Sequence, residues 1–211
     1  MLNKRNEYSE SLLVHFRRAE DLRGKALGYQ TLDLNARQLS DLELLLNRAL
    51  YPLTGYLGRG DYESVLERMR LADGTVWPLP ICLDVKEEFA RSLQPGQKLA
   101  LNDQEGFLLA VLTVQEIWQP DKLREARQVY GTGDNGAHPG VQQLLESVHD
   151  WYVGGPVEGM SLPVHYDFRE LRLTPSETHR RFTQYGWRRV LGFHTEEYLH
   201  CAHREMVLAA A

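Results

Sequence analysis

The sequence predicts an α+β fold in two parts: a mixed first part built around a small antiparallel barrel or sheet, and a shorter second part that ends on helix, strand and helix. Short apolar runs rich in Leu, Val and Ile lie between Trp77 and Val114, separated by the turn-forming segments QPGQ and NDQEG. Segments on both sides of this region repeat apolar residues at helical spacing. A strong helix-start signal, T-P-S-E, follows later, and we place a boundary near residues 168–173, which divides the chain into domains 1–170 and 171–211.

Composition and charge restrict the classes of function. The 211 residues are 43% hydrophobic and 25% charged, as in ordinary folded proteins. The formal net charge is -5, whereas a nucleic-acid-binding protein needs clustered lysine and arginine. The N-terminal stretch carries charges where a secretory signal needs an apolar run of about 7–15 residues. We therefore expect a cytoplasmic protein that has neither a nucleic-acid partner nor a membrane partner.

The first domain is expected to combine amphipathic helices with short strands. Ser40 is a candidate cap for a helix through DLELLLNRAL, and Asp61 opens a second helix through YESVLERMR. The runs LPICLDV, KLAL and FLLAVLTV indicate strands, the last two forming a hairpin, while KLREARQVY and VQQLLESV indicate two further helices. WYVGGPVEGM returns to strand, and its adjacent glycines, Gly154 and Gly155, mark a bend or a close approach of another backbone segment.

The second domain opens on the clearest helix signal in the sequence. Thr174 is predicted to cap the helix, Pro175 to occupy its first turn and Glu177 to complete a capping box. After Gly186 the run RRVLGFH indicates a strand, and EEYLHCAHREMVLAAA indicates a last helix. A single strand leaves both of its edges unpaired. We therefore expect either that the chain is a fragment of a longer polypeptide or that its tail docks onto the first domain or a second subunit.

The segment GFHTEEYLHCAH carries the main candidate site. His200 and His203 are three residues apart, so a helix places them on one side, where they can donate hydrogen bonds to a polyphosphate. The alternative is that the two histidines merely pack against or cap an ordinary helix. The segment also contains residue types that bind zinc or iron, namely His194, Glu197, His200, Cys201 and His203. A metal site is nevertheless not expected, because Cys201 points roughly 100° away from His200 around a helix and the histidine pair needs further ligands from elsewhere.

Other candidates are weaker. Cys82 and Cys201 lack any metal-ribbon spacing and are expected to be reduced thiols. His165, Tyr166 and Asp167 form a catalytic trio on paper, but their position near the domain boundary favours a packed corner.

Several long stretches, in order along residues 20–203, resemble the sulfate adenylyltransferase (ATP sulfurylase) family. DLELLLNRALYPLTGYL is similar to the family's form DLELLLNGAFSPLTGFM, and MRLADGTVWPLPICLDV to MRLADGTLWPIPITLDV. The remaining matches are IWQPDKLREARQVYGT, AHPGV, YVGGPVE and HYDFRELRLTPSETHRRFTQYGWRRVLGF. The resemblance implies a PUA-like first domain, which contains a β-barrel, followed by the truncated beginning of a Rossmann-like nucleotidyltransferase domain. It also implies the reaction of ATP and sulfate to adenylyl sulfate and pyrophosphate.

The resemblance carries residue roles with it. The family's motif reads F-Q-T-R-N-P-x-H-x-x-H, and Phe193, Thr195, His200 and His203 match it. The two histidines then correspond to the contacts with the ATP phosphates. ATP accompanied by Mg²⁺ is implied as a substrate, and no tightly bound cofactor is expected.

The other motif positions differ from the family. His194 replaces the glutamine and Glu196 the arginine of the sulfate site, while Glu197 replaces the asparagine and Tyr198 the proline. A carboxylate about 4 Å from an anion is repelled by roughly 4 kcal/mol per unit charge at an effective dielectric constant near 20. We expect residues 194–197 to form a degenerate substrate site that does not bind sulfate.

Two functions remain open at this point. The family's later glycine-rich G-R-D nucleotide segment is not found before Ala211, so the chain alone is expected not to catalyse adenylyl transfer. The first possibility is the N-terminal portion of a sulfate adenylyltransferase. The second is a catalytically inactive interaction or regulatory module, associated with or fused to the adenylylsulfate kinase that some family members carry. A homo-oligomer or a missing C-terminal catalytic or kinase portion is expected in either case.

Overall fold

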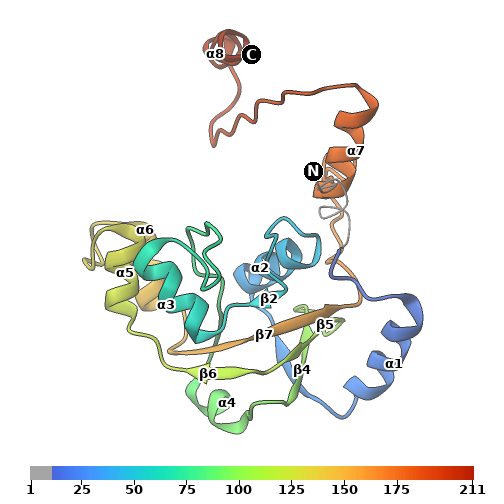
Figure 1. Cartoon of the computed structure of the whole chain (residues 1–211), viewed down its shortest axis with the longest axis vertical. Coiled ribbons are helices and arrows are strands. Elements are labelled where there is room, and N and C mark those ends of the chain that lie inside the picture. Colours follow the sequence, from blue (N-terminus) through green and yellow to red (C-terminus); the bar gives the residue numbers. More distant parts are fainter. Residues whose placement is uncertain (1–10) are drawn as a thin grey trace. The chain divides into compact units, whose positions relative to one another are not determined.

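The computed structural model describes residues 11–211, which divide into two compact units, the first ending at Arg172 and the second beginning at Leu173. The helices of the first unit are α1 (Phe16–Ala26), α2 (Ala36–Leu46), α3 (Arg59–Arg68), α4 (Glu87–Ser92), α5 (Lys122–Tyr130) and α6 (Pro139–Glu146). Its strands are β1 (Gln30–Asp33), β2 (Gly55–Tyr56), β3 (Leu83–Val85), β4 (Lys98–Asn102), β5 (Leu108–Thr113), β6 (Glu116–Trp118) and β7 (Trp151–Gly159). Figure 1 shows the sheet with α3, α5 and α6 gathered at one end of β7.

The strands form one curled sheet in the order β1-β4-β5-β7-β2, and β3 and β6 also pair with β7. The β1–β4 pair is parallel and the other pairs are antiparallel. β7 divides its partners along its length, because Val157–Gly159 pair with β5 whereas Tyr152 and Val153 pair with both β3 and β6. The sheet therefore closes into a half-barrel, which confirms the predicted mixture of helices with a small, mainly antiparallel sheet.

The glycine pair of β7 allows the close approach that the sequence indicated as one alternative. A Cβ atom at Gly154 would lie 2.3 Å from the Leu57 carbonyl oxygen, and one at Gly155 would lie 2.0 Å from the Thr113 carbonyl oxygen. Gly155 also has a φ of 153°, outside the range that side chains readily adopt. Only glycine fits these two positions without displacement of a neighbouring strand.

Several predicted element boundaries were wrong. The helix predicted to be capped by Ser40 is capped five residues earlier by Asn35, whose side chain accepts the Gln38 amide at 3.0 Å while the Gln38 side chain accepts the Asn35 amide at 3.1 Å. Only Leu83–Val85 of LPICLDV is a strand, and α1, β1, β2, α4 and β6 were not predicted. The KLAL and FLLAVLTV hairpin is confirmed as β4 and β5.

The second unit contains two helices and, among its described residues, no strand. α7 (Pro175–Gln184) has the predicted capping box, in which Thr174 accepts the Glu177 amide and Glu177 accepts the Thr174 amide. The predicted strand RRVLGFH is wrong, since residues 187–200 are irregular up to α8 (Cys201–Ala210). The predicted α-β-α segment is thus helix, irregular chain and helix, because a lone strand in this unit has no ladder to join. None of the described helices is long and apolar enough to cross a membrane.

A buried carboxylate ties three elements of the first unit together. Oε2 of Glu125 in α5 accepts hydrogen bonds from the hydroxyls of Tyr62 in α3 at 2.9 Å and Tyr152 in β7 at 3.0 Å. The two tyrosine rings and that of Trp118 in β6 pack with centroids 5.8 Å apart. Burial raises the pKa of Glu125, and the two tyrosine hydrogen bonds oppose the shift.

We predict that Gly154→Ala lowers the free energy of unfolding by roughly 3 kcal/mol, because the added methyl group meets backbone that cannot move alone. Gly60→Ala is the control, since a methyl group there meets nothing within 4 Å and the stability stays within about 0.5 kcal/mol. Urea unfolding followed by circular dichroism measures both. Equal stability of Gly154→Ala and the parent would contradict the close approach.

We predict that Glu125→Ala destabilises the first unit by roughly 3 kcal/mol, because two buried tyrosine hydroxyls lose their acceptor, whereas Glu125→Gln keeps an acceptor and costs less. The raised pKa means that the folded state binds a proton more tightly than the unfolded state. The contribution of Glu125 to the unfolding free energy therefore falls as the pH rises from the ordinary value of 4.5 through the raised value.

Urea titrations of the parent and of Glu125→Gln over this pH range measure that contribution. The difference in unfolding free energy, variant minus parent, is expected to increase as the pH rises. A difference that stays constant with pH would show that Glu125 ionises as it does in the unfolded chain.

Candidate functional site

The irregular segment before α8 presents the predicted sulfate-site positions to solvent. Thr195 Oγ1 accepts a hydrogen bond from the Glu197 amide at 3.0 Å, and this local turn fixes the position of the Glu197 backbone. The side chains of His194, Glu196 and Glu197 are exposed. Within the described residues, neither Glu196 nor Glu197 forms an ion pair. The turn therefore presents two uncompensated carboxylates in succession.

The two candidate phosphate contacts lie against each other at the start of α8. His200 is the N-cap residue of the helix, and its side chain makes no capping hydrogen bond. Its ring stacks on that of His203, with centroids 3.9 Å apart and ring planes 25° apart. The structure thus brings the two imidazoles together, although His200 precedes α8, whereas the sequence predicted that one helix carries both histidines. Their contact with a phosphate stays a prediction.

Glu197 joins this pair. Glu197, His200 and His203 each place one possible ligand atom within 4.8 Å of the other two. Cys201 and His194, which the sequence also offered as donors, are not in the group. Nδ1 of His203 is buried and has no hydrogen-bond partner. The further ligand that the histidine pair needed for a metal ion is thus supplied from three residues upstream.

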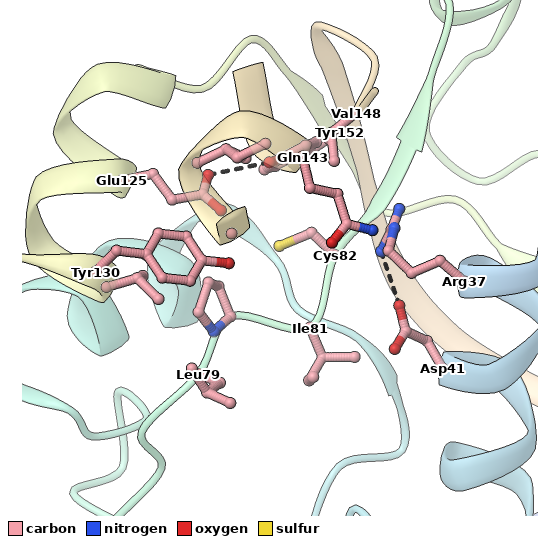
Figure 2. A pocket seen from close by; sticks show the side chains of 14 residues that line it. Arg37, Asp41, Leu79, Ile81, Cys82, Glu125, Tyr130, Gln143, Val148 and Tyr152 are labelled. Carbon is pink, nitrogen blue, oxygen red and sulfur yellow. Dashed lines mark hydrogen bonds and ion pairs between the residues drawn. The ribbon is translucent and has the colours of Figure 1, made fainter. Parts of the chain in front are cut away.

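A separate cavity of about 180 Å³ lies in the first unit, where α2, α5, α6 and the start of β7 meet. Figure 2 shows Glu125 and Tyr130 on one side of the cavity, Arg37 and Asp41 on the other, and Cys82 between them. Sequence analysis missed this cavity, because its walls come from segments more than a hundred residues apart. The spacing of Arg37 and Asp41, four residues apart on one helix, was the only local signal.

The chemistry of the cavity does not suit a nucleotide. Its one cation, Arg37, donates to Asp41 at 2.8 Å and also pairs with the buried Asp84, so no positive charge is free for an anion. Burial raises the pKa of Asp41, with Arg37 opposing the shift, and burial also raises the pKa of the Cys82 thiol. A protonated thiol is a poor nucleophile. The volume is also below the roughly 300 Å³ at which ligand pockets usually begin.

The possible catalytic trio near the domain boundary, His165, Tyr166 and Asp167, does not assemble. His165 Nε2 lies 2.9 Å from the Glu43 carboxylate, while Tyr166 is 83% exposed and Asp167 pairs with Arg172 at 2.9 Å. His165 and Asp167 pair with other residues and Tyr166 is exposed, so the three side chains form no catalytic arrangement.

Comparisons with known proteins agree with the resemblance. Residues 6–162 match the PUA-like domain family, and residues 169–211 match the ATP-sulfurylase family. The sulfate adenylyltransferase of Eremothecium gossypii is 44% identical over 89% of this chain and 37% of its own length. That of Kluyveromyces lactis is 47% identical over 84% of this chain and 35% of its own length. The chain therefore spans about a third of the length of these curated relatives.

A solved structure also matches almost the whole chain. The hexameric APS kinase from Thiobacillus denitrificans is similar with a TM-score of 0.77 and 32% identity, over 95% of this chain and 35% of that one. The half-barrel, the two consecutive family matches and the curated relatives all lead to one assignment: this chain belongs to the sulfate adenylyltransferase family, with a PUA-like domain over residues 6–162.

Proposed function

We propose that this chain is a sulfate adenylyltransferase-family protein whose sulfate site has become degenerate and which does not transfer an adenylyl group on its own. One observation carries the proposal. Glu196 and Glu197 are exposed and unpaired among the described residues, at the positions where the family motif has arginine and asparagine. An arginine offers a permanently charged fork to an oxyanion, whereas a carboxylate repels it.

The exposure of Glu196 sets the size of this effect. Water screens an exposed charge, so the repulsion of an anion about 4 Å away falls towards roughly 1 kcal/mol per unit charge, below the value expected for a partly buried site. The interaction between Glu196 and an anion is still repulsive, and the attraction that an arginine would supply is lost as well. The turn therefore contributes no favourable electrostatic free energy to sulfate binding.

The phosphate half of the motif keeps its groups. α8 presents free backbone amides at its N-terminus, and His200 leaves them uncapped. His200 and His203 stand beside those amides and can donate to phosphate oxygens of ATP, which would arrive with Mg²⁺ as a substrate. ATP binding without sulfate activation is the resulting behaviour.

A second candidate function is a non-catalytic module that holds an adenylylsulfate kinase in an oligomer. It is favoured by the similarity of 95% of this chain to part of a hexameric APS kinase. In this function the PUA-like unit supplies structure and contacts, and the degenerate motif has no catalytic duty. The partner would be a kinase portion or further copies of the chain.

We predict that the chain releases no pyrophosphate above background from ATP and Mg²⁺ with either sulfate or molybdate. The measurement is a coupled pyrophosphate assay with a curated relative as the positive control. Turnover by this chain that depends on sulfate would contradict the proposal.

We predict that the triple change His194→Gln, Glu196→Arg and Glu197→Asn creates sulfate binding that calorimetry detects and that the parent lacks, because it replaces repulsion with a bidentate cation. Glu88→Arg is the matched control, since it makes the same charge change at an exposed position in α4. Sulfate binding by the parent, or an equal gain in the control, would count against a site at residues 194–197.

We predict that ATP with Mg²⁺ binds the parent. His200→Ala and His203→Ala should each weaken this binding by about tenfold, because each removes one hydrogen bond to a phosphate oxygen. His179→Ala removes an exposed imidazole from α7 and serves as the control. Unchanged ATP affinity in both histidine variants would remove the phosphate role.

A further inference from the structure

We propose that Glu197, His200 and His203 form a binding site for one divalent transition-metal ion, with Zn²⁺ as the ion that their chemistry fits best. One possible ligand atom of each residue lies within 4.8 Å of the other two, and no other group of this kind occurs among residues 11–211. The inference stands on this geometry and does not depend on the proposed function.

Local structure brings the three residues together. The turn at Thr195 fixes the backbone position of Glu197, because Thr195 Oγ1 accepts a hydrogen bond from the Glu197 amide at 3.0 Å. His200 ends the irregular segment and His203 lies in the first turn of α8, with the two rings stacked at 3.9 Å. The ligands thus follow the pattern Glu-x-x-His-x-x-His across the start of one helix. Bonds of about 2.0–2.2 Å to an ion require these atoms to come closer than they are, so the three side chains must rotate and the stacked rings must turn on binding.

The imidazole pair has few competing interactions to lose. Nδ1 of His203 is buried without a hydrogen-bond partner, and an unpartnered buried nitrogen costs roughly 1–3 kcal/mol. The His200 side chain makes no capping hydrogen bond, so ordinary capping does not account for its position. The Phe193 ring lies beside the His203 imidazole, with centroids 5.7 Å apart. An apolar neighbour of this kind limits the access of solvent to a metal site.

The donor set selects the class of ion. Two imidazoles and one carboxylate suit Zn²⁺ and its transition-metal neighbours, whereas Mg²⁺ and Ca²⁺ prefer oxygen ligands throughout. Residues 193–203 contain Glu196 and Glu197 and no lysine or arginine, so their formal charge is negative when the histidines are neutral. The same charge that disfavours sulfate therefore favours a cation.

The number of ligands indicates an open site. Cys201 follows His200 directly but its sulfur is not among the clustered atoms, so the site does not have the closed cysteine-rich set of a structural zinc. Three protein ligands leave a fourth position for water or for an oxygen of an incoming anion. The site is thus suited to hold an exchangeable ligand on the metal.

The test uses the untagged full chain, freed of metal with a chelator and then titrated with Co²⁺. We expect one ion per chain, with visible d–d absorption bands of a low-coordinate cobalt site, and displacement of these bands by Zn²⁺. Glu197→Gln and His203→Ala are each expected to weaken Zn²⁺ binding by at least about tenfold. Far-UV circular dichroism of each variant checks that α8 is retained.

The controls are His194→Gln, which changes a neighbouring imidazole outside the cluster, and His179→Ala in α7. Both should bind Zn²⁺ as the parent does. Absence of the cobalt bands at saturating Co²⁺, or an equal loss of affinity in the controls, would overturn the inference. If the chain bound both zinc and sulfate, the metal site would stand and the proposed function would fall. If it bound neither, the proposed function would stand and the metal site would fall.

Discussion

The first unit depends on how closely other backbone segments approach the adjacent glycines of β7. The Leu57 and Thr113 carbonyl oxygens occupy the space in which side chains of Gly154 and Gly155 would lie. This absence of side chains lets one nine-residue strand pair with β2, β3, β5 and β6 and curl the sheet into a half-barrel. Tyr152, two residues before the glycines, is thereby placed where its hydroxyl reaches the buried carboxylate of α5.

The second unit presents a different constraint, which is electrostatic. In the family motif a cation faces the incoming oxyanion, whereas this chain offers Glu196 and Glu197, both exposed. The histidine pair that follows is kept, and Glu197 now lies beside it. One substitution pattern would therefore explain both the proposed loss of the sulfate site and the proposed metal site, because a carboxylate repels sulfate and can be a ligand for a metal ion.

Sequence reasoning succeeded where a short segment determines the outcome. The capping box of Thr174 is a contact within four residues. Adjacent glycines in a strand indicate a bend or a close backbone approach, whichever segment lies beside them. Sequence reasoning failed where distant segments decide: the run RRVLGFH has strand propensity but no partner in its unit. The acceptor role of Glu125 requires Tyr62 and Tyr152 from other elements. A metal site was not expected from the sequence, because Glu197 precedes the helix and helical geometry alone does not place its carboxylate beside His200 and His203.

The central claim is that residues 194–197 no longer bind sulfate, and that Glu197 instead joins His200 and His203 in a site for a cation. Nuclear magnetic resonance spectra of the ¹⁵N-labelled chain, titrated first with sulfate and then with Zn²⁺, test it directly at individual amides. The account predicts that the amides of Thr195, Glu196 and Glu197 do not respond to sulfate, and that those of Glu197, His200 and His203 shift with one equivalent of Zn²⁺. Saturable shifts at Thr195 and Glu196 with sulfate, and none with Zn²⁺, would contradict it.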